Sequence, residues 1–522
     1  MIDVAIVGAG LAGLALAHRL QAEGLTVKLF DARTRAGGRI LTHTEGEGAA
    51  VDLGASWFWP DTEPRITALV QALGLRAFDQ PDVGQVLTLT DPNAGPKPLD
   101  TEGIHGGAQR LSGGTSSIIE ALLQSLAPDS LTLSHRLVAL KHEGKLVELQ
   151  FSHDANGVSH VVRVQAKRVV LVMPPRLIAQ HVRFHPELPA VTQDALRAVS
   201  TWMAREAKAA ARFSRPFWLN KGHSGSAFVN HSQAMLREVW DASDERGAAL
   251  AGFSALSADM RPQFARSLNL LVESQFTQLF GEHEDPIDIL KQDWAMEPWT
   301  CSDLDLADEA PTPPMADPVL RRPHWDGHLY FGGTETARQA AGHMEGALES
   351  AARLADFLRP ATPLATQAGD HLEAALTAFS LWVDQARQAA LDRYRQHLNQ
   401  MLARQDRDSV TQRALLATVE QTYANALEEL ARLDVRAVDM PPSGRSELTP
   451  RVLAAFSGFS KAVVDEALAF NRTSCALSNF PDEHKPDPDY LRVITADLVA
   501  AWREFALATN DLLCTRSQQA VG

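Results

Sequence analysis

The chain opens with a glycine-rich turn set between a short apolar segment and a helical pattern. Residues 2–7, IDVAIV, are apolar and rich in β-branched side chains, as in a buried strand of a parallel sheet. Gly8, Gly10 and Gly13 follow as a GxGxxG motif, and a second apolar segment ends at Asp31. The order of strand, turn, helix, strand and acid predicts a Rossmann-like unit that binds a dinucleotide. A glycine-rich turn in another kind of βαβ unit is the alternative.

Each part of this motif has a physical role. Gly8 permits the tight turn, Gly10 lets the backbone approach a pyrophosphate, and Gly13 lets the helix pack closely on the strand. The free N–H groups and the positive dipole end of the helix suit phosphates. Asp31 lies 18 residues past Gly13 and is placed to accept hydrogen bonds from ribose hydroxyls.

Two further segments distinguish FAD from NAD. Residues Ala32–Ile40 read ARTRAGGRI, and Val51–Pro60 read VDLGASWFWP. Here the chain resembles the flavin-containing amine oxidases, the monoamine oxidase-like family, which has GGR after the acid and D-x-G-A/G-x-W/Y near the flavin. The resemblance implies FAD as the cofactor. Arg39 offers a planar fork for the pyrophosphate, and a surface salt bridge is the alternative.

The resemblance continues in the family's order over residues 1–358. The matching segments are Arg110–Leu122, Leu131–Leu140, Val169–Pro175, Ala207–Trp218, Asp293–Thr300 and Leu329–Arg353. It implies that the backbone of Leu137 touches adenine and that Glu335 contacts the ribityl–pyrophosphate region. It also implies that the backbone N–H of Met344 contacts the C2 carbonyl of the flavin.

The last matching segment also has a reading from its residues alone. LYF, followed by Gly332 and Gly333, predicts a buried strand that closely approaches a cofactor. Apolar side chains at helical spacing then predict a helix over Gly342–Phe357. Its N-terminus would point at the pyrimidine end of the flavin and stabilise negative charge there by about 0.3–2 kcal/mol. An ordinary packing helix is the alternative.

Lys208 lies among alanines in AREAKAAARF, a segment that predicts a buried strand or helix. A buried lysine is costly without partners. The family has a lysine eight residues before the proline of PFW, which here is Pro216. The resemblance implies that Lys208 holds a water against flavin N5, where a cation favours developing negative charge. The alternative is a lysine that extends along the alanines to the surface.

The sequence departs from the family at the substrate side of the flavin. Many members flank the amine with two aromatic residues, but here His343 replaces one and Leu304 stands near the other. We expect the aromatic cage to be absent or rebuilt, with Trp299 or Trp57 as candidates. His343 is either a group that titrates beside the substrate or a passive wall.

Two other departures concern the flavin link and the cover of the site. Vertebrate members attach flavin through a cysteine whose matched position here is Asp303, and Cys301 is two residues short of it. We therefore expect non-covalent FAD. The family's long helical insert is short here, over Gln80–Gly106, which predicts a more open flavin.

The region after residue 358 lies outside the resemblance. Residues 359–368 read as a linker, and 369–522 are dominated by helix formers, which predicts a small all-α bundle. We expect helices over His371–Leu402, Thr411–Leu433, Pro450–Phe470 and Asp487–Leu513, with a break at Ser443-Gly444. The bundle serves either for docking or dimerisation, or as a cover for the substrate cavity.

Composition argues against several classes of partner. The formal net charge of −15 argues against nucleic acid or an anionic membrane as a partner. Three separated cysteines indicate neither a disulfide scaffold nor a zinc site, and we expect no metal. No leader pattern or apolar span is found, so we expect a cytoplasmic protein, with a homodimer as one option.

These observations together predict a fold and a reaction. We expect an α/β Rossmann-like FAD-binding domain (1–80, 107–200 and 295–358), an α+β substrate domain (81–106 and 201–294) and the helical bundle. The reaction would be FAD-dependent oxidation of an amine to an imine, which hydrolyses to an aldehyde or ketone and ammonia, with O2 reduced to H2O2. A flavin dehydrogenase or desaturase with another electron acceptor is the alternative, and a redox-sensing module is a third reading.

The predicted site residues fall into two groups. The catalytic candidates are Lys208, His343 and Trp299. The cofactor-binding candidates are Gly8, Gly10, Leu11, Ala12, Gly13, Asp31, Ala32, Arg33, Gly38, Arg39, Gly54, Ala55, Ser56, Trp57, Leu137, Gly333, Glu335, Gly342, His343 and Met344. The substrate stays open: Arg176, Arg205 and Arg237 are unassigned, and an acidic anchor such as Glu238 or Asp241 would suit a polyamine or be solvated.

Overall fold

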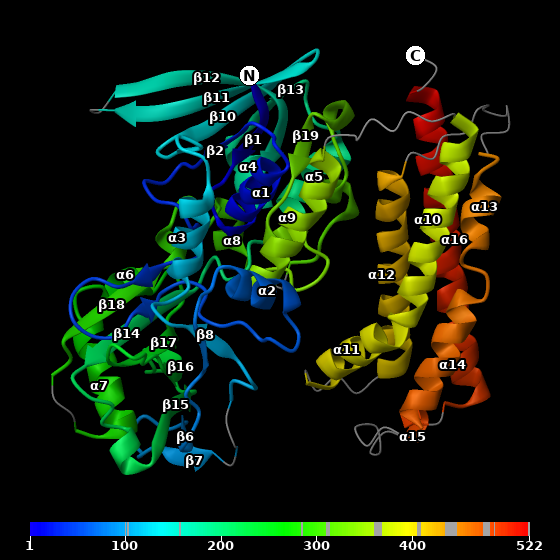
Figure 1. Cartoon of the computed structure of the whole chain (residues 1–522). Helices are drawn as coiled ribbons and strands as arrows, with labels where there is room; N and C mark the ends of the chain where they lie inside the picture. Colours follow the sequence, from blue (N-terminus) through cyan, green and yellow to red (C-terminus); the bar gives the residue numbers. More distant parts are fainter. Residues whose placement is uncertain are drawn as a thin grey trace. The chain divides into compact units, whose positions relative to one another are not determined.

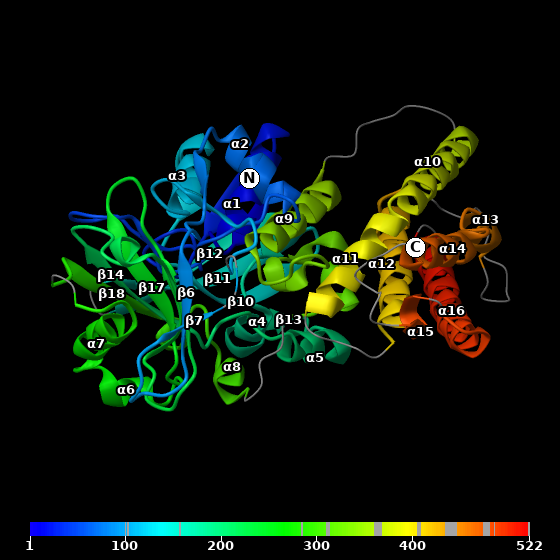
Figure 2. The same ribbon diagram turned by 90° about the horizontal axis from the view of Figure 1, so that it is seen from below.

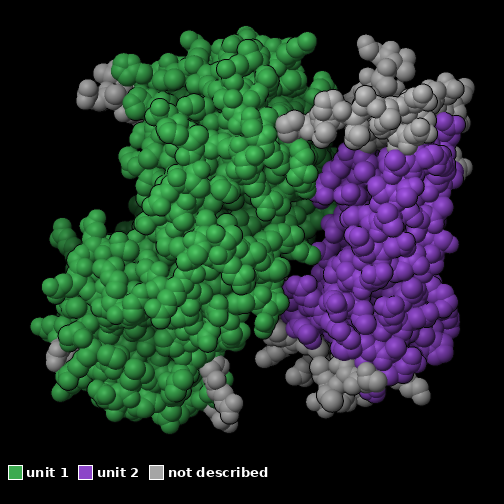
Figure 3. All heavy atoms as spheres, viewed as in Figure 1, with its two compact units in different colours: residues 1–359 green, residues 360–522 purple. Residues whose placement is uncertain are grey.

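A computed structural model of the chain shows two compact units, residues 1–359 and 360–522, each with its own hydrophobic core (Figure 3). The residues it describes are 1–99, 101, 104–155, 158–282, 285–308, 314–359, 368–403, 409–433, 446–472, 481–484 and 486–519.

The first sheet of unit 1 has the order β13-β10-β11-β12-β1-β2-β9, with β19 beside β12 (Figure 1). Its strands are β1 (Ile2–Val7), β2 (Val27–Phe30), β9 (Leu131–Thr132), β10 (Arg136–Glu143), β11 (Leu146–Ala155), β12 (Val158–Leu171), β13 (Arg183–His185) and β19 (Leu329–Phe331). β1, β2, β9, the end of β12 and β19 pair in parallel. Because parallel strands end at one edge, the segments that follow them meet there.

Helices α1 (Leu11–Ala22), α3 (Ser116–Ser125) and α9 (Met344–Leu358) pack on this sheet, and α1 and α9 lie side by side (Figures 1 and 2). Alanines and leucines along α1 are buried, which lets the neighbouring helix and strand approach closely. The helix predicted over 342–357 is α9, whose bounds differ from the prediction by two residues at its start and by one at its end.

The second sheet has the order β18-β14-β17-β16-β15-β6-β7 and lies apart from the first (Figure 1). Its strands are β6 (Gln85–Leu89), β7 (Lys97–Leu99), β14 (Ala207–Phe213), β15 (His223–Val229), β16 (Leu236–Asp241), β17 (Ala248–Ser254) and β18 (Asp288–Asp293). β14 and β17 are buried along their whole length. The described part of the segment 80–106 therefore contributes β6 and β7 to this sheet.

The remaining described elements of unit 1 connect these layers. They are β3 (Thr42–His43), β4 (Val51–Asp52), α2 (Pro64–Ala72), β5 (Ala77–Asp79), β8 (Gln109–Leu111), α4 (Pro175–His181), α5 (Ala190–Ala198), α6 (Arg261–Phe264), α7 (Leu268–Phe280) and α8 (Asp303–Ala307). Short 3-10 turns lie at Leu219–Lys221, Trp294–Met296, Pro318–Arg321, Trp325–Gly327 and Thr334–Thr336.

The described part of unit 2 is all helical. Its helices are α10 (Ala368–Gln388), α11 (Ala390–Ala403), α12 (Val410–Arg432), α13 (Thr449–Ala454), α14 (Phe459–Asn471), α15 (Pro481–His484) and α16 (Pro488–Gln519). Two predicted helices are each divided: 371–402 breaks at Ala389, and 450–470 breaks before Gly458, whose φ of +72° leaves the helical region. Ser443-Gly444 and all but the ends of the predicted linker lie outside the described residues.

The predicted fold class is confirmed: a Rossmann-like domain, a second α+β layer and a helical C-terminal region. The boundaries within unit 1 stay a prediction, although the strands of the two sheets come from separate parts of the chain. Among the described helices, none combines the length and apolar character of a membrane span.

Candidate active site

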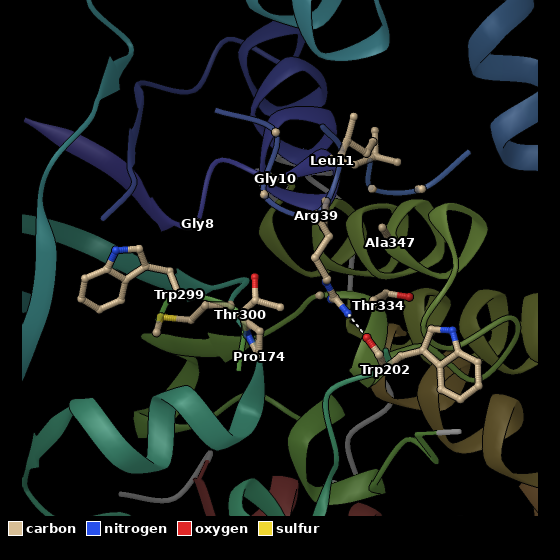
Figure 4. Close-up of a pocket in the computed structure, with 18 of the residues that line it drawn as sticks. Gly8, Gly10, Leu11, Arg39, Pro174, Trp202, Trp299, Thr300, Thr334 and Ala347 are labelled. Carbon is tan, nitrogen blue, oxygen red and sulfur yellow. Dashed lines mark hydrogen bonds between the residues drawn. The ribbon is translucent and has the colours of Figure 1, made fainter. Parts of the chain in front are cut away.

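A cavity of about 420 Å³ lies where the parallel strands of the first sheet end (Figure 4). The segments that follow β1, β2, β12 and β19 line one side, and Lys208 and Phe253 of the second sheet line another. Most of the predicted cofactor residues border it, at the edge where open α/β sheets bind ligands.

The turn after β1 depends on glycines at positions where a Cβ atom would not fit. A Cβ on Gly13 would lie 2.0 Å from the Gly8 carbonyl oxygen, and one on Gly8 would lie 2.8 Å from that of Val172. Gly10 differs, because its added Cβ would meet protein atoms only at 3.9 Å. Gly10 lines the cavity, so its bare backbone leaves room for a ligand rather than for protein packing. This is the fit expected for a pyrophosphate.

The N-terminus of α1 faces the same space. The helix begins at Leu11, its N-cap is Gly10, and no side chain caps it. Leu11 and Ala12 line the cavity, so their uncapped N–H groups suit an anionic ligand.

Asp31 directly follows β2, and two backbone N–H groups hold its carboxylate. Its Oδ2 accepts the Ala9 N–H at 2.8 Å and its Oδ1 accepts the Arg33 N–H at 2.8 Å. Each oxygen keeps a further lone pair, and Asp31 and Ala32 line the cavity, as a ribose ligand requires. The Arg33 side chain instead binds Glu297 at 2.9 Å and Thr300 at 2.7 Å, so it ties the 297–300 loop to this end of the cavity.

Arg39 follows a turn in which Gly37 and Gly38 have positive φ. Its Nη1 lies 2.6 Å from Glu335 Oε1 and donates to the Trp202 carbonyl at 3.3 Å, the contact dashed in Figure 4. The pair is internal rather than on the surface, since Glu335 is 1% exposed. Glu335 therefore orients Arg39 along the cavity wall.

The N-terminus of α9 borders the cavity at another point. The helix starts at Met344, and His343, its N-cap residue, makes no side-chain cap. The Glu345 carboxylate turns away and accepts the Arg65 and Ile66 N–H groups at the start of α2. The first amides of α9 thus have no capping side chain. Gly342 packs on Trp202, because an added Cβ would lie 2.5 Å from that ring.

Lys208 is buried on β14 and does not reach the surface. Its Nζ donates to the Gly54 carbonyl at 2.6 Å and to Ser56 Oγ at 2.8 Å. The rings of Trp57, Trp240 and Phe253 surround it at 5.1–5.4 Å, a cation–π setting. Burial lowers the pKa of Lys208 to about 8, although the nearby Asp52 carboxylate opposes this.

His343 has a specific partner. Its Nδ1 lies 2.8 Å from Glu63 Oε1, while Glu63 Oε2 accepts the Trp59 N–H at 3.0 Å. Glu63 is buried, whereas the His343 side chain is 42% exposed and lines the cavity. Because a carboxylate only accepts, Nδ1 donates, and in the neutral imidazole Nε2 is then the acceptor.

The two tryptophans proposed to rebuild the aromatic cage lie in different places. Trp299 contacts His181 and adjoins the Thr300–Arg33 bond, at the end of the cavity away from Trp202 (Figure 4). Trp299 lines the cavity, and Arg33 ties its loop beside Asp31, so its role as a cage residue stays a prediction. Trp57 packs against Trp240 and is a neighbour of Lys208.

The sequence did not predict that Trp202 and Phe253 line the cavity or that Glu63 is the partner of His343. No motif marks them, and pairing across strands and helices brings them together. Leu137, by contrast, lines the cavity at a β-bulge in β10, where a regular strand would direct it differently.

Cys301 does not line this cavity. The residue is buried, and burial raises the pKa of its thiol to about 12. Asp303, at the position matched to the attachment cysteine, is exposed and bonds to Gln180.

Comparison with known proteins agrees with this geometry. Residues 95–358 match the model of the flavin containing amine oxidoreductases, and residues 6–73 match an NAD(P)-binding Rossmann-like domain. Pig (Sus scrofa) amine oxidase [flavin-containing] B is 23% identical over 68% of this chain and 85% of its own length. Putrescine oxidase of Kocuria rosea is 25% identical over 57% and 83%.

A solved structure shares the fold. Cyclohexylamine oxidase from Brevibacterium oxydans IH-35A superposes with a TM-score of 0.57 at 18% identity, over 69% of this chain and 98% of that one. The family match covers half of the chain and contains Lys208, Glu335 and α9, while the Rossmann-like match contains the glycine turn and Asp31. The chain therefore belongs to the flavin-containing amine oxidoreductase family and is an FAD-dependent oxidoreductase.

Proposed function

We propose that the protein oxidises a primary or secondary amine to an imine, which hydrolyses to an aldehyde or ketone and ammonia or an amine, while O2 is reduced to H2O2. The observation that carries the proposal is the buried Lys208 ammonium at the cavity wall, ringed by aromatic side chains. When bound, FAD supplies the two-electron acceptor.

The chain's own groups would hold FAD without a covalent bond. Asp31 binds the ribose, while Gly10, the α1 N-terminus and Arg39 receive the pyrophosphate. The uncapped start of α9 at Met344 stabilises negative charge on the pyrimidine side, by about 0.3–2 kcal/mol from the dipole. The absence of Cys301 from the cavity lining supports a non-covalent cofactor.

Lys208 has the environment for oxygen chemistry. An ammonium in a nonpolar enclosure stabilises developing negative charge more strongly than one in water does. Its hydrogen bonds to Gly54 and Ser56 fix its position, so no reorganisation is needed when that charge appears. A dehydrogenase that avoids oxygen has no need of such a cation, and this favours the oxidase over the alternative.

The substrate amine would meet His343 on the other side of the cavity. Glu63 holds the imidazole with Nε2 as the acceptor, so His343 receives an N–H of the amine and orients the carbon to be oxidised. Trp202 and Phe253 line the cavity as apolar walls.

The variant His343→Phe is expected to raise KM for the amine about 10- to 100-fold, the effect of a lost hydrogen bond to a charged or strongly polar group. Glu63→Gln should shift KM in the same direction by less, because glutamine no longer dictates the tautomer. Steady-state kinetics at matched FAD content measures both. An unchanged KM in His343→Phe would show that His343 lines the cavity without binding the amine.

A panel of amines and amino acids, assayed for H2O2, tests the function. We expect peroxide in proportion to amine consumed. The contrary result is that an amine reduces the flavin without forming peroxide, with turnover only when an artificial electron acceptor is present. That result would show a dehydrogenase and not an oxidase.

A chain that ends at Arg359 is expected to keep its FAD and a kcat/KM within about threefold of the full chain. The reason is that the described cores of the two units share no residue, and α9 ends before the boundary. Flavin content and amine kinetics of the two forms measure this. A large rise in KM in the shortened form would instead support residues 369–522 as a cover of the cavity.

A further inference from the structure

A second cavity of about 270 Å³ adjoins the first. The two share four wall residues, Trp202, Met203, Glu206 and Phe253. These shared residues place the two cavities side by side, with Phe253 between Lys208 of the first cavity and the wall of the second. The second cavity differs in character, because charged side chains make up much of its wall.

The second sheet places one carboxylate in line with Lys208. Phe253 of β17 pairs with Lys208 of β14 on one side and with Glu238 of β16 on the other. Residues paired across strands point to the same face, so Lys208, Phe253 and Glu238 form a row. Two strand spacings put the Cα atoms of Lys208 and Glu238 about 10 Å apart. The row has a cation at one end, an aromatic ring in the middle and an anion at the other end.

The arginines of the second cavity already have hydrogen-bond partners within the protein. Arg176 binds Asp305 at 2.8 Å and Asp308 at 3.1 Å. Arg237 binds Glu206 at 2.7 Å, and Arg205 donates to the Asp308 carbonyl.

Glu238 stands apart from these pairs. No hydrogen bond or ion pair joins its side chain to another residue of the described chain. Burial raises the pKa of Glu238, although His105, Arg237 and Lys208 oppose the shift and Glu206 adds to it. A half-buried carboxylate in this state gains most from a cationic ligand.

Asp241, the other acidic anchor that the sequence offers, has a different role. Its Oδ2 accepts the Trp218 Nε1–H at 2.9 Å and its Oδ1 accepts the Ser243 N–H at 2.8 Å. It lines neither cavity and holds the strand end instead.

We propose that Glu238 binds the distal cationic group of the substrate, so that the protein acts on diamines or polyamines rather than on monoamines or amino acids. The proposal rests on the amine oxidation proposed above. One amine lies beside the flavin site and His343, the carbon chain crosses the Phe253 ring, and the second ammonium pairs with Glu238. An amino acid fits poorly, since the three arginines of the second cavity are engaged by the partners above.

The test compares two substrates that differ only in the distal group, putrescine and n-butylamine. The unmodified protein is expected to have a kcat/KM for putrescine at least about tenfold higher, in line with a charge-assisted hydrogen bond. Glu238→Gln should lower kcat/KM for putrescine at least about tenfold more than it lowers kcat/KM for n-butylamine. Glu273→Gln on α7, which lines neither cavity, is the control and should preserve the preference.

Equilibrium binding of the two amines under anaerobic conditions separates the two proposals. Glu238→Gln is expected to raise the Kd of putrescine at least about tenfold relative to that of n-butylamine. An equal effect on both amines, or an unchanged putrescine Kd, would overturn the role of Glu238 whatever the turnover. If kcat/KM for n-butylamine equals or exceeds kcat/KM for putrescine, the preference for diamines is wrong. The proposed oxidation of amines would still hold. If no amine is oxidised, the proposed function itself is wrong.

Discussion

Replacing Lys208 by methionine is expected to slow the oxygen-dependent half of the reaction about 100-fold or more while FAD stays bound, the size of effect seen when one preorganised electrostatic group is removed. Methionine replaces the lysine stem with an unbranched apolar chain one atom shorter, and it removes the charge and the donors. The variant loses the bonds to Gly54 and Ser56, which hold the ammonium at the cavity wall. Reduction by the amine should change less, because the ammonium is not required to take the substrate hydrogen.

The pH dependence of the oxygen-dependent half follows from the same residue. The pKa of Lys208 is lowered by burial to about 8, so the ammonium is present below that pH and lost above it. The rate of the oxygen-dependent half should therefore fall as pH rises through about 8, and Lys208→Met should lack this fall.

Stopped-flow mixing of the amine-reduced protein with oxygen measures both effects. Lys221→Met is the control, since Lys221 is an exposed lysine of the same sheet layer that donates to the Phe280 carbonyl. A Lys208→Met protein that reacts with oxygen at the normal rate would show that the cation has no part in this step.

Replacing Gly13 by alanine is expected to abolish retention of FAD through purification and to destabilise unit 1 by about 3 kcal/mol, the upper range for an overpacked site. The new Cβ would lie 2.0 Å from the Gly8 carbonyl oxygen and 3.1 Å from Val172 Cγ2. Both neighbours belong to the walls of the phosphate turn, so neither can shift without moving it. The start of α1 would be displaced from the position that receives the pyrophosphate.

Gly95→Ala is the matched control for this change. Gly95 has no positive φ, and no atom lies within 4 Å of an added Cβ. Flavin content and thermal unfolding of the two variants measure the effect. A Gly13→Ala protein with full FAD content and unchanged unfolding would contradict the assignment of this turn.

The features that were predictable from sequence are local. The strand, glycine turn, helix and Asp31 follow one another within about thirty residues, and their geometry is set by φ angles and by the absence of Cβ atoms. The α9 helix was predictable for the same reason, from its apolar period. The alanines around Lys208 predicted a buried segment, and every residue of β14 is buried.

The features that were not predictable depend on pairing between distant segments. Glu238 meets Phe253, and Phe253 meets Lys208, only through the register of β16, β17 and β14. Glu63 reaches His343 because α2 and α9 begin at the same place, although they are far apart in the chain. The part of the cavity wall that Trp299 joins was not predictable either, because spacing along the chain gives no information about which wall a loop joins, and its role as a cage residue stays a prediction.

The most direct measurement is the visible spectrum of the purified protein, taken before and after heat denaturation. We expect a yellow protein whose flavin is bleached by putrescine under anaerobic conditions and is released to the supernatant as FAD by heat. Protein that carries no flavin would contradict the proposal that Gly10, Asp31 and α1 bind FAD. Flavin that stays with the precipitated chain would contradict non-covalent binding, and FAD that no amine bleaches would contradict the proposed reaction.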